Sequence, residues 1–162
     1  MARIDTKPKA ILEAVQRRLI ATGAFTTDNC EISQHDADLE MTPGEAWSTI
    51  WIEGGNFDDE QVDGGVATIT AAVSVGVHCR LLLDEAGRDD RSLLQASSGL
   101  LVLADKVFQS FWLHDLEDEA GDNILRQPMR PISMGGPQRP AGDWASIIKT
   151  FEVMFDWKVD AD

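Results

Sequence analysis

A fourteen-residue stretch, Val66–Cys79, alternates between two kinds of side chain and thereby restricts what the chain can fold into. A period of two sustained over this length is typical of a strand with one buried face, and no helix produces it. One row is apolar, and the other is small and mostly polar: Ile69, Ala71, Val73, Val75, Val77 and Cys79 form the first, and Thr68, Thr70, Ala72, Ser74, Gly76 and His78 form the second.

A second stretch, Ala145–Val159, alternates in the same way and is expected to pair with the first. Two long strands that are apolar on one side and polar on the other predict an antiparallel sheet with one covered face. The apolar row and the polar row are Ile147, Phe151, Val153, Phe155, Trp157 and Val159, and Thr150, Glu152, Asp156 and Lys158.

The length of these strands bears on function. At ~3.3 Å per residue, fourteen residues span roughly 46 Å, whereas a compact domain of this size has a radius of gyration of only about 15 Å. The strands must therefore bend, or run past the core and present an edge to something else. An assembling subunit needs such an edge more often than an enzyme does.

The other predicted elements complete a single α+β domain over residues 1–162. Its sheet is antiparallel or mixed, has about four strands, and carries two helices packed on one face. The further elements are a helix at Thr6–Ala21, a strand at Glu45–Glu53, a helix from Ser92 to about Leu116, and a short strand at Ile124–Gln127 followed by a Pro/Gly-rich loop to Gly142. The stretch Phe25–Gly44 is polar and irregular.

The composition excludes several classes of protein. Twenty-eight acidic residues against fourteen basic ones give a formal net charge of −14, whereas affinity for DNA or RNA comes chiefly from Lys and Arg. The acidity serves solubility, or it repels DNA from a surface that DNA passes. No apolar run approaches the ~20 residues of a membrane span. The N-terminal residues lack the apolar core of a secretion signal, and Cys30 and Cys79 are expected to be reduced thiols, so synthesis in the cytosol is expected.

No motif predicts catalysis, metal binding or a cofactor. His35, His78 and His114 stand in unrelated contexts. His78 and Cys79 are neighbours on a strand and point to opposite faces, so we expect Cys79 in the core and His78 on the surface. The acidic clusters do not match a calcium loop, and the glycine pairs do not match a phosphate-binding loop.

The tryptophans are divided between core and interface. Trp112 and Trp157 belong to apolar rows and are predicted to be core residues. Trp47, Trp51 and Trp144 are candidates for a subunit interface, where aromatic side chains are enriched.

In order and pattern the chain resembles the tail terminator (tail completion) proteins of long-tailed bacteriophages. The matching features are an N-terminal helix ILEAVQRRLIATG, a Trp-bearing strand AWSTIWI, the long strand ATITAAVSVGVHC, an amphipathic helix LLVLADKVFQSFW after a charged loop, a Pro/Gly loop RQPMRPISMGGPQRPAGDW and a closing strand IKTFEVMFDWKV. The chain departs from this pattern in Phe25–Gly44 and in its strong acidity.

The resemblance implies a structural virion subunit that is made in the host cytoplasm. Such proteins form a ring, usually of six copies, that caps the tail tube, contacts the tail-tube and head-closure or connector proteins, and lets DNA pass without specific binding. No membrane contact is implied. Three segments are expected to carry the contacts or line the channel, or else to be merely solvated loops: Asp58–Glu60, Asp84–Arg91 and Pro128–Pro140. The charged candidates among them are Asp58, Asp59, Glu60, Asp84, Glu85, Arg88, Asp89, Asp90 and Arg91.

Two alternatives stay open at the level of the sequence. Another neck or tail protein, such as a head-closure or tail-tube subunit, would share the acidity and the strand content. A small cytosolic α+β enzyme would need a concave site with convergent polar groups, which the sequence does not show.

Overall fold

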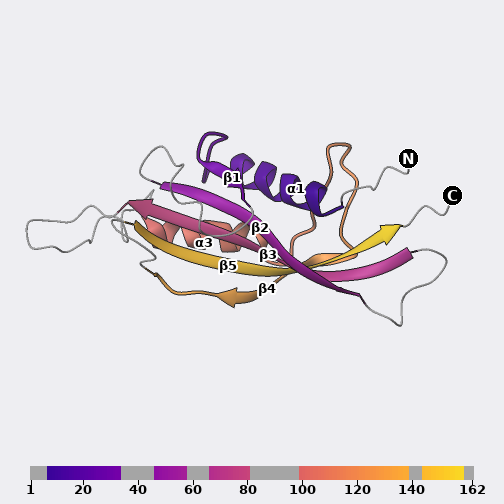
Figure 1. The fold of residues 1–162 in the computed structure, drawn as a ribbon. Coiled ribbons are helices and arrows are strands. Elements are labelled where there is room, and N and C mark those ends of the chain that lie inside the picture. Colours follow the sequence, from indigo (N-terminus) through magenta and orange to yellow (C-terminus); the bar gives the residue numbers. More distant parts are fainter. Residues whose placement is uncertain (1–6, 34–45, 58–65, 81–98, 139–143, 159–162) are drawn as a thin grey trace, which may run out of the picture.

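The computed structural model describes residues 7–33, 46–57, 66–80, 99–138 and 144–158, which form two helices and one five-stranded sheet (Figure 1). The predicted α+β class is confirmed, with one strand more than expected. In chain order the elements are α1 (Lys7–Ala21), β1 (Cys30–Ile32), β2 (Ala46–Phe57), β3 (Val66–Arg80), α3 (Leu100–Phe111), β4 (Gln127–Met134) and β5 (Trp144–Lys158).

The two long alternating strands pair with each other over their full length, as predicted. β3 and β5 run antiparallel in an unbroken register from Val66 opposite Lys158 to Arg80 opposite Trp144. β2 pairs antiparallel with the other side of β3, so the sheet order is β1-β2-β3-β5-β4 with β3 at its centre. Figure 1 shows a strongly twisted sheet in which the Val66 end of β3 and the Lys158 end of β5 extend past both helices.

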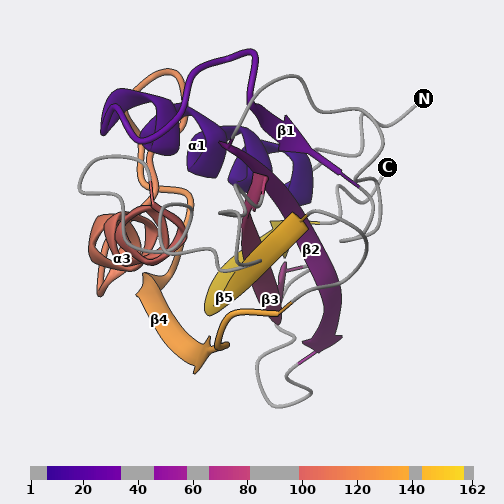
Figure 2. The ribbon, with the colours of Figure 1, turned by 90° about the vertical axis from the view of Figure 1, so that its left-hand side faces the viewer.

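Both helices pack on the same face of the sheet, as expected from the apolar rows (Figure 2). The apolar side chains of β3 and β5 are buried there against one stripe from each helix. From α1 the stripe consists of Ile11, Ala14, Val15 and Leu19, and from α3 it consists of Leu100, Leu103, Ala104, Val107 and Phe111. Successive spacings of three and four residues bring these side chains onto one side of each helix.

The additional strand, β1, pairs in parallel with β2 over only three residues. It lies within the stretch predicted to be irregular. The sequence did not reveal it because only Cys30 of the three side chains is buried and three residues cannot show a period. Polar side chains hold it instead: Gln16 Nε2 donates to the Cys30 carbonyl at 2.6 Å, and Asn29 Nδ2 donates to the Ala46 carbonyl at 3.1 Å. The parallel pair makes the sheet mixed.

The prediction for the proline-rich stretch was wrong in its placement of the strand. β4 spans Gln127–Met134 and therefore includes Pro128 and Pro131, where a loop was expected. β4 lies at the edge of the sheet, and an edge strand tolerates proline because one side of it needs no ladder donors. Irregularities in its register fall between Gln127 and Arg130 and between Pro131 and Ser133. Arg130 is tied to Glu152 of β5 by an ion pair of 3.2 Å.

The second helix ends earlier than predicted. α3 stops at Phe111, and Trp112 already has an extended backbone while its N–H still donates to the Phe108 carbonyl. Leu113 has a φ of 49°, a left-handed conformation that ends a helix. The prediction that the helix runs to Leu116 was wrong because the apolar stripe continues through Trp112 although the backbone does not. The predicted start at Ser92 lies outside the described residues.

Candidate functional site

The protruding end of the sheet carries an apolar groove. It has a volume of about 270 Å³ and lies where Pro8 of α1 approaches the strands. Ile52, Ile69, Phe155 and Trp157 supply most of its wall. Since Ile52 and Trp157 are only partly buried, the groove is open to solvent on one side.

Two glycines shape one wall of this groove. The register of β2 against β3 shifts between Glu53 and Gly55, which marks a bulge, and Gly54 has a φ of 31° that side-chain-bearing residues rarely adopt. A Cβ on Gly55 would lie 2.6 Å from Cγ2 of Ile69. The bulge therefore lets β2 approach β3 closely while leaving the space above the strands empty.

A second apolar feature is the corner that follows α3, Trp112–Leu113. Trp112 is 52% exposed and Leu113 is 60% exposed. The corner is held on both sides, because the Trp112 N–H donates to the Phe108 carbonyl at 3.0 Å and the His114 carbonyl accepts from the Met129 N–H at 2.8 Å. The Trp112 ring also packs edge-on against Phe108 with centroids 4.8 Å apart. Two large apolar side chains are thus displayed to solvent by a fixed backbone.

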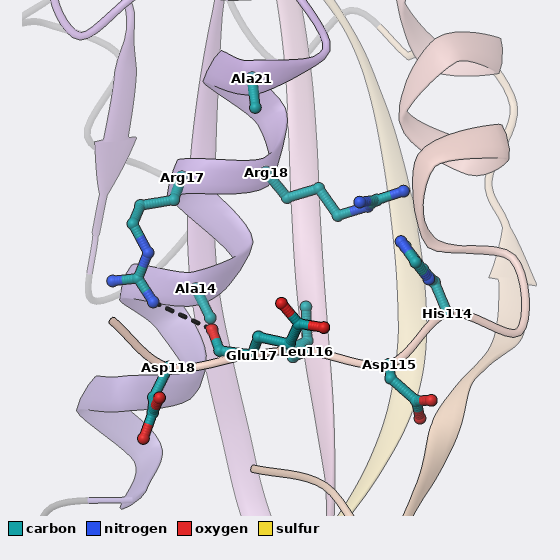
Figure 3. Close-up of a pocket in the computed structure, with 9 residues that line it drawn as sticks. All are labelled: Ala14, Arg17, Arg18, Ala21, His114, Asp115, Leu116, Glu117 and Asp118. Atoms are coloured by element: carbon teal, nitrogen blue, oxygen red, sulfur yellow. Dashed lines mark hydrogen bonds between the residues drawn. The ribbon is translucent and has the colours of Figure 1, made fainter. Parts of the chain in front are cut away.

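A polar hollow lies between α1 and the segment after α3 (Figure 3). It has a volume of about 370 Å³. Arg18 extends across it toward His114, while its Nε donates to the Ser110 carbonyl at 2.7 Å. Arg17 donates to the Glu117 carbonyl at 3.1 Å and lies 3.9 Å from the carboxylate of Glu119.

The charges around this hollow oppose one another. Burial lowers the pKa of the His114 imidazole, and the positive charge of Arg18 lowers it further, whereas Asp115 and Glu117 raise it. Burial also lowers the pKa of Arg18, against the effect of Glu117. The carboxylates of Asp115, Glu117, Asp118 and Glu119 outnumber the two arginines here, and both arginines already bond to backbone carbonyls. We interpret the arrangement as the joint that holds α1 to the segment after α3.

The polar row of β3 is less exposed than the sequence predicted. His78 is only 1% exposed, so its assignment to the surface was wrong. Its Nε2 lies 2.8 Å from Thr49 Oγ1 and its Nδ1 lies 2.6 Å from Ser146 Oγ, while its ring stacks on Trp47 at 5.2 Å. The two hydroxyls that bracket this buried imidazole fix its orientation. The cluster therefore joins β2, β3 and β5 on the face away from the helices.

Trp47 and Trp51, two of the residues predicted to lie at a subunit interface, are buried within the protomer. Trp47 is fully buried and Trp51 is 5% exposed, with its Nε1 donating to Glu53 at 3.1 Å. Conversely, Trp112 was assigned to the core and is half exposed, and Trp157 is partly buried at the groove. The periodicity of each strand or helix assigned each indole to a face but could not show which part of that face stays uncovered.

The other predicted contact residues are not brought together by the described structure. Trp144 opens β5 opposite Arg80, and only its backbone is described. Of the Pro128–Pro140 segment, residues 128–138 are described, and β4 is its main element. The acidic and charged candidates lie outside the described residues: Asp58, Asp59, Glu60, Asp84, Glu85, Arg88, Asp89, Asp90 and Arg91.

The groove and the exposed corner were missed by the sequence analysis. The adjacent Gly54-Gly55 within an otherwise alternating strand was a signal for a bulge, since a glycine inside a strand often marks one. The corner carried no such signal, because Trp112 continues the apolar stripe of the helix.

Within the described ranges, no group of three or more His, Cys, Asp or Glu side chains is arranged to hold a metal ion. Asp118, from one of the acidic clusters, instead accepts from the N–H groups of Ala120 and Asp122 at 2.8 and 2.9 Å. Among these same residues, no helix has the length and apolar character required to span a membrane.

Comparison with known proteins yields similarity at the level of fold. No protein-family model and no curated protein sequence matches the chain. A chain in the solved structure described as the virion of a native gene transfer agent particle matches with a TM-score of 0.58 and 12% identity, over 94% of this chain and 98% of that chain. A second solved chain matches over 95% of this chain and 97% of its own length with 15% identity, but its TM-score of 0.47 is too low to support a conclusion. This chain therefore shares its fold, over nearly its whole length, with a chain of a gene transfer agent virion.

Proposed function

We propose that this protein is a structural subunit of a phage-like virion, and that it acts as a tail terminator: a ring that caps the tail tube and joins it to the head. The observation that carries the proposal is the similarity of fold to a chain of the gene transfer agent virion, because it extends over nearly the full length of both chains. The order of elements in the sequence independently resembles that of tail terminators.

The physical character of the chain supports this role. A ring needs a contact between two different patches of neighbouring copies, related by a rotation that closes. The open groove at the end of the sheet and the exposed apolar corner after α3 are two such patches. The formal charge of −14 per copy would keep passing DNA from adhering to the ring.

The state of assembly tests the proposal. Size-exclusion chromatography with light scattering on the purified chain is expected to give one discrete mass several times 17.8 kDa, either alone or after addition of tail tubes. Open filaments would identify a tail-tube subunit instead. A monomer or dimer that neither assembles nor binds tube ends would contradict the proposal.

Location in the particle gives a second, independent test. Gold-labelled antibody against the chain should mark the junction of head and tail in purified virions. Particles made without the protein should contain separate heads and tails of irregular length, because an uncapped tube continues to polymerise. Label along the whole tail would contradict the role of a terminator.

A further inference from the structure

The Trp112–Leu113 corner consists of large apolar side chains that the protomer leaves in solvent. At 52% and 60% exposure these side chains forgo about half or more of the stabilisation that complete burial of an apolar side chain provides. Leu113 also has a φ of 49°, which is uncommon outside glycine, asparagine and aspartate. A strained residue that displays an apolar side chain suggests a contact made outside the protomer.

The groove at the protruding end of the sheet has the size and the lining for such a side chain. A cavity of roughly 150 Å³ lined by Leu, Ile and Phe holds benzene, and the groove has about 270 Å³ lined by Ile52, Ile69, Phe155 and Trp157. It lies just below the range of about 300–1,000 Å³ usual for small-molecule sites. One large side chain fits these dimensions better than a cofactor does.

Within one copy, the corner does not fill the groove. The corner follows α3 and is bonded to β4 through the Met129 N–H, whereas the groove is formed by the start of α1 and by β2, β3 and β5. The exposure of Trp112 and Leu113 shows that the corner is not seated in its own groove.

We infer that the Trp112–Leu113 corner of one copy inserts into the apolar groove at Ile52, Ile69 and Trp157 of a second copy. The two patches differ, so the contact is head-to-tail and can repeat around a ring. An aromatic side chain seated in a desolvated pocket is the usual energetic centre of an interface. The inference deepens the proposed function, on which it rests, by naming the surfaces that join neighbouring subunits.

The first experiment removes the apolar side chain without disturbing the fold. Asparagine accepts a positive φ, so Leu113→Asn should leave the protomer folded, as circular dichroism would verify. Loss of an interface anchor is expected to raise the dissociation constant of self-assembly about 10- to 30-fold in sedimentation velocity. The matched control is Ile132→Asn on β4, where a similarly exposed apolar residue (50%) belongs to the edge strand and not to the corner, and should change assembly little.

The second experiment tests the pairing directly by disulfide formation. In a chain with both Ile52→Cys and Leu113→Cys, oxidation should link successive copies into a ladder on non-reducing gels, because each copy contributes one of each cysteine. Mixing the two single variants should stop at a linked dimer. The native Cys30 and Cys79 are buried and should not compete.

The outcomes separate the inference from the function on which it rests. A discrete ring that shows no link between positions 52 and 113, and that Leu113→Asn leaves intact, overturns the inference while leaving the terminator role in place. If Ile132→Asn weakens self-assembly as much as Leu113→Asn does, the inference is also overturned, and the edge strand β4 becomes the better candidate for the interface. A chain that stays monomeric, binds no tube ends and gives no link overturns both.

Discussion

At the scale of single residues, the imidazole of His78 shows how the polar row of the central strand is used. It lies between the hydroxyls of Thr49 and Ser146 and against the ring of Trp47, and so connects three strands through side chains. Each of these hydrogen bonds is buried, where the loss of one partner costs more than it would at the surface. The face of the sheet away from the helices is therefore specified by polar contacts.

Thr49→Val tests this interpretation. The substitution keeps the shape and the β-branching but removes the hydroxyl that bonds to His78 Nε2. We expect the free energy of unfolding in urea to fall by about 1–3 kcal/mol. Thr70→Val is the matched control on β3, where the side chain is only partly buried, and it should change stability by less than about 0.5 kcal/mol. Equal effects of the two substitutions would show that the Thr49 hydroxyl contributes nothing particular.

His114 gives a pH-dependent contribution to stability at the α1 joint. Its pKa is lowered from 6.5 in the folded protein, chiefly by burial and then by Arg18, with Asp115 and Glu117 acting in the opposite sense. Between the lowered pKa and 6.5 the unfolded chain binds more protons, so stability falls as the pH drops through this window.

The difference in unfolding free energy between the wild type and His114→Gln isolates this contribution. The free energy of unfolding of the wild type minus that of the variant should be larger at pH 8 than at pH 5, as measured by urea unfolding at both pH values. Other titrating groups cancel in the difference, provided that they are the same in both proteins. A difference that does not change with pH would contradict a lowered pKa.

At the scale of elements, the predictions succeeded where a period could be read over many residues. β3 and β5 were located to within a residue or two because their rows of side chains alternate over more than a dozen positions. The bounds of β4 were not predicted, because Pro128 and Pro131 are typical of loops. Only the edge position of the strand in the folded sheet makes them acceptable. β1 was not predicted, because its three residues are held in place by hydrogen bonds from Gln16 and Asn29, and no local sequence pattern reveals such contacts.

The β2 bulge offers a test of how the groove is kept open. Gly55→Ala would place a Cβ 2.6 Å from Cγ2 of Ile69, a buried β-branched side chain with little freedom to move. We expect a loss of about 1–3 kcal/mol in urea unfolding, as for other overpacked sites. The control is Gly136→Ala, where no atom lies within 4 Å of the added Cβ, and stability should be unchanged or slightly higher. A neutral Gly55→Ala would mean that the strands can part there without cost.

At the scale of the whole molecule, assembly has to overcome repulsion between acidic copies. Each copy carries a formal charge of −14. At 0.1 M salt, repulsion between charges more than about 10 Å apart is largely screened. An apolar contact is not weakened by salt, whereas an interface built on ion pairs would be.

The dependence of assembly on salt should therefore distinguish the two kinds of interface. We expect the assembled fraction to rise as NaCl is raised from about 0.05 to 0.5 M, because the screening length shortens over this range, with light scattering as the measurement. Leu113→Asn should lower assembly at every salt concentration. A ring that dissociates as salt is added would favour charged contacts over the apolar corner.

The position of β3 has a consequence for how the protein is made. Val66 pairs with Lys158 and Arg80 with Trp144, so one whole side of the central strand has no partner until the ribosome has delivered residues 144–158. Contacts between such distant parts of a chain form slowly, and an unpaired strand edge can meanwhile recruit a wrong neighbour. Strand β5, once paired with β3, also completes the groove through Phe155 and Trp157. A nascent copy therefore lacks a complete groove until its last strand has been made and paired.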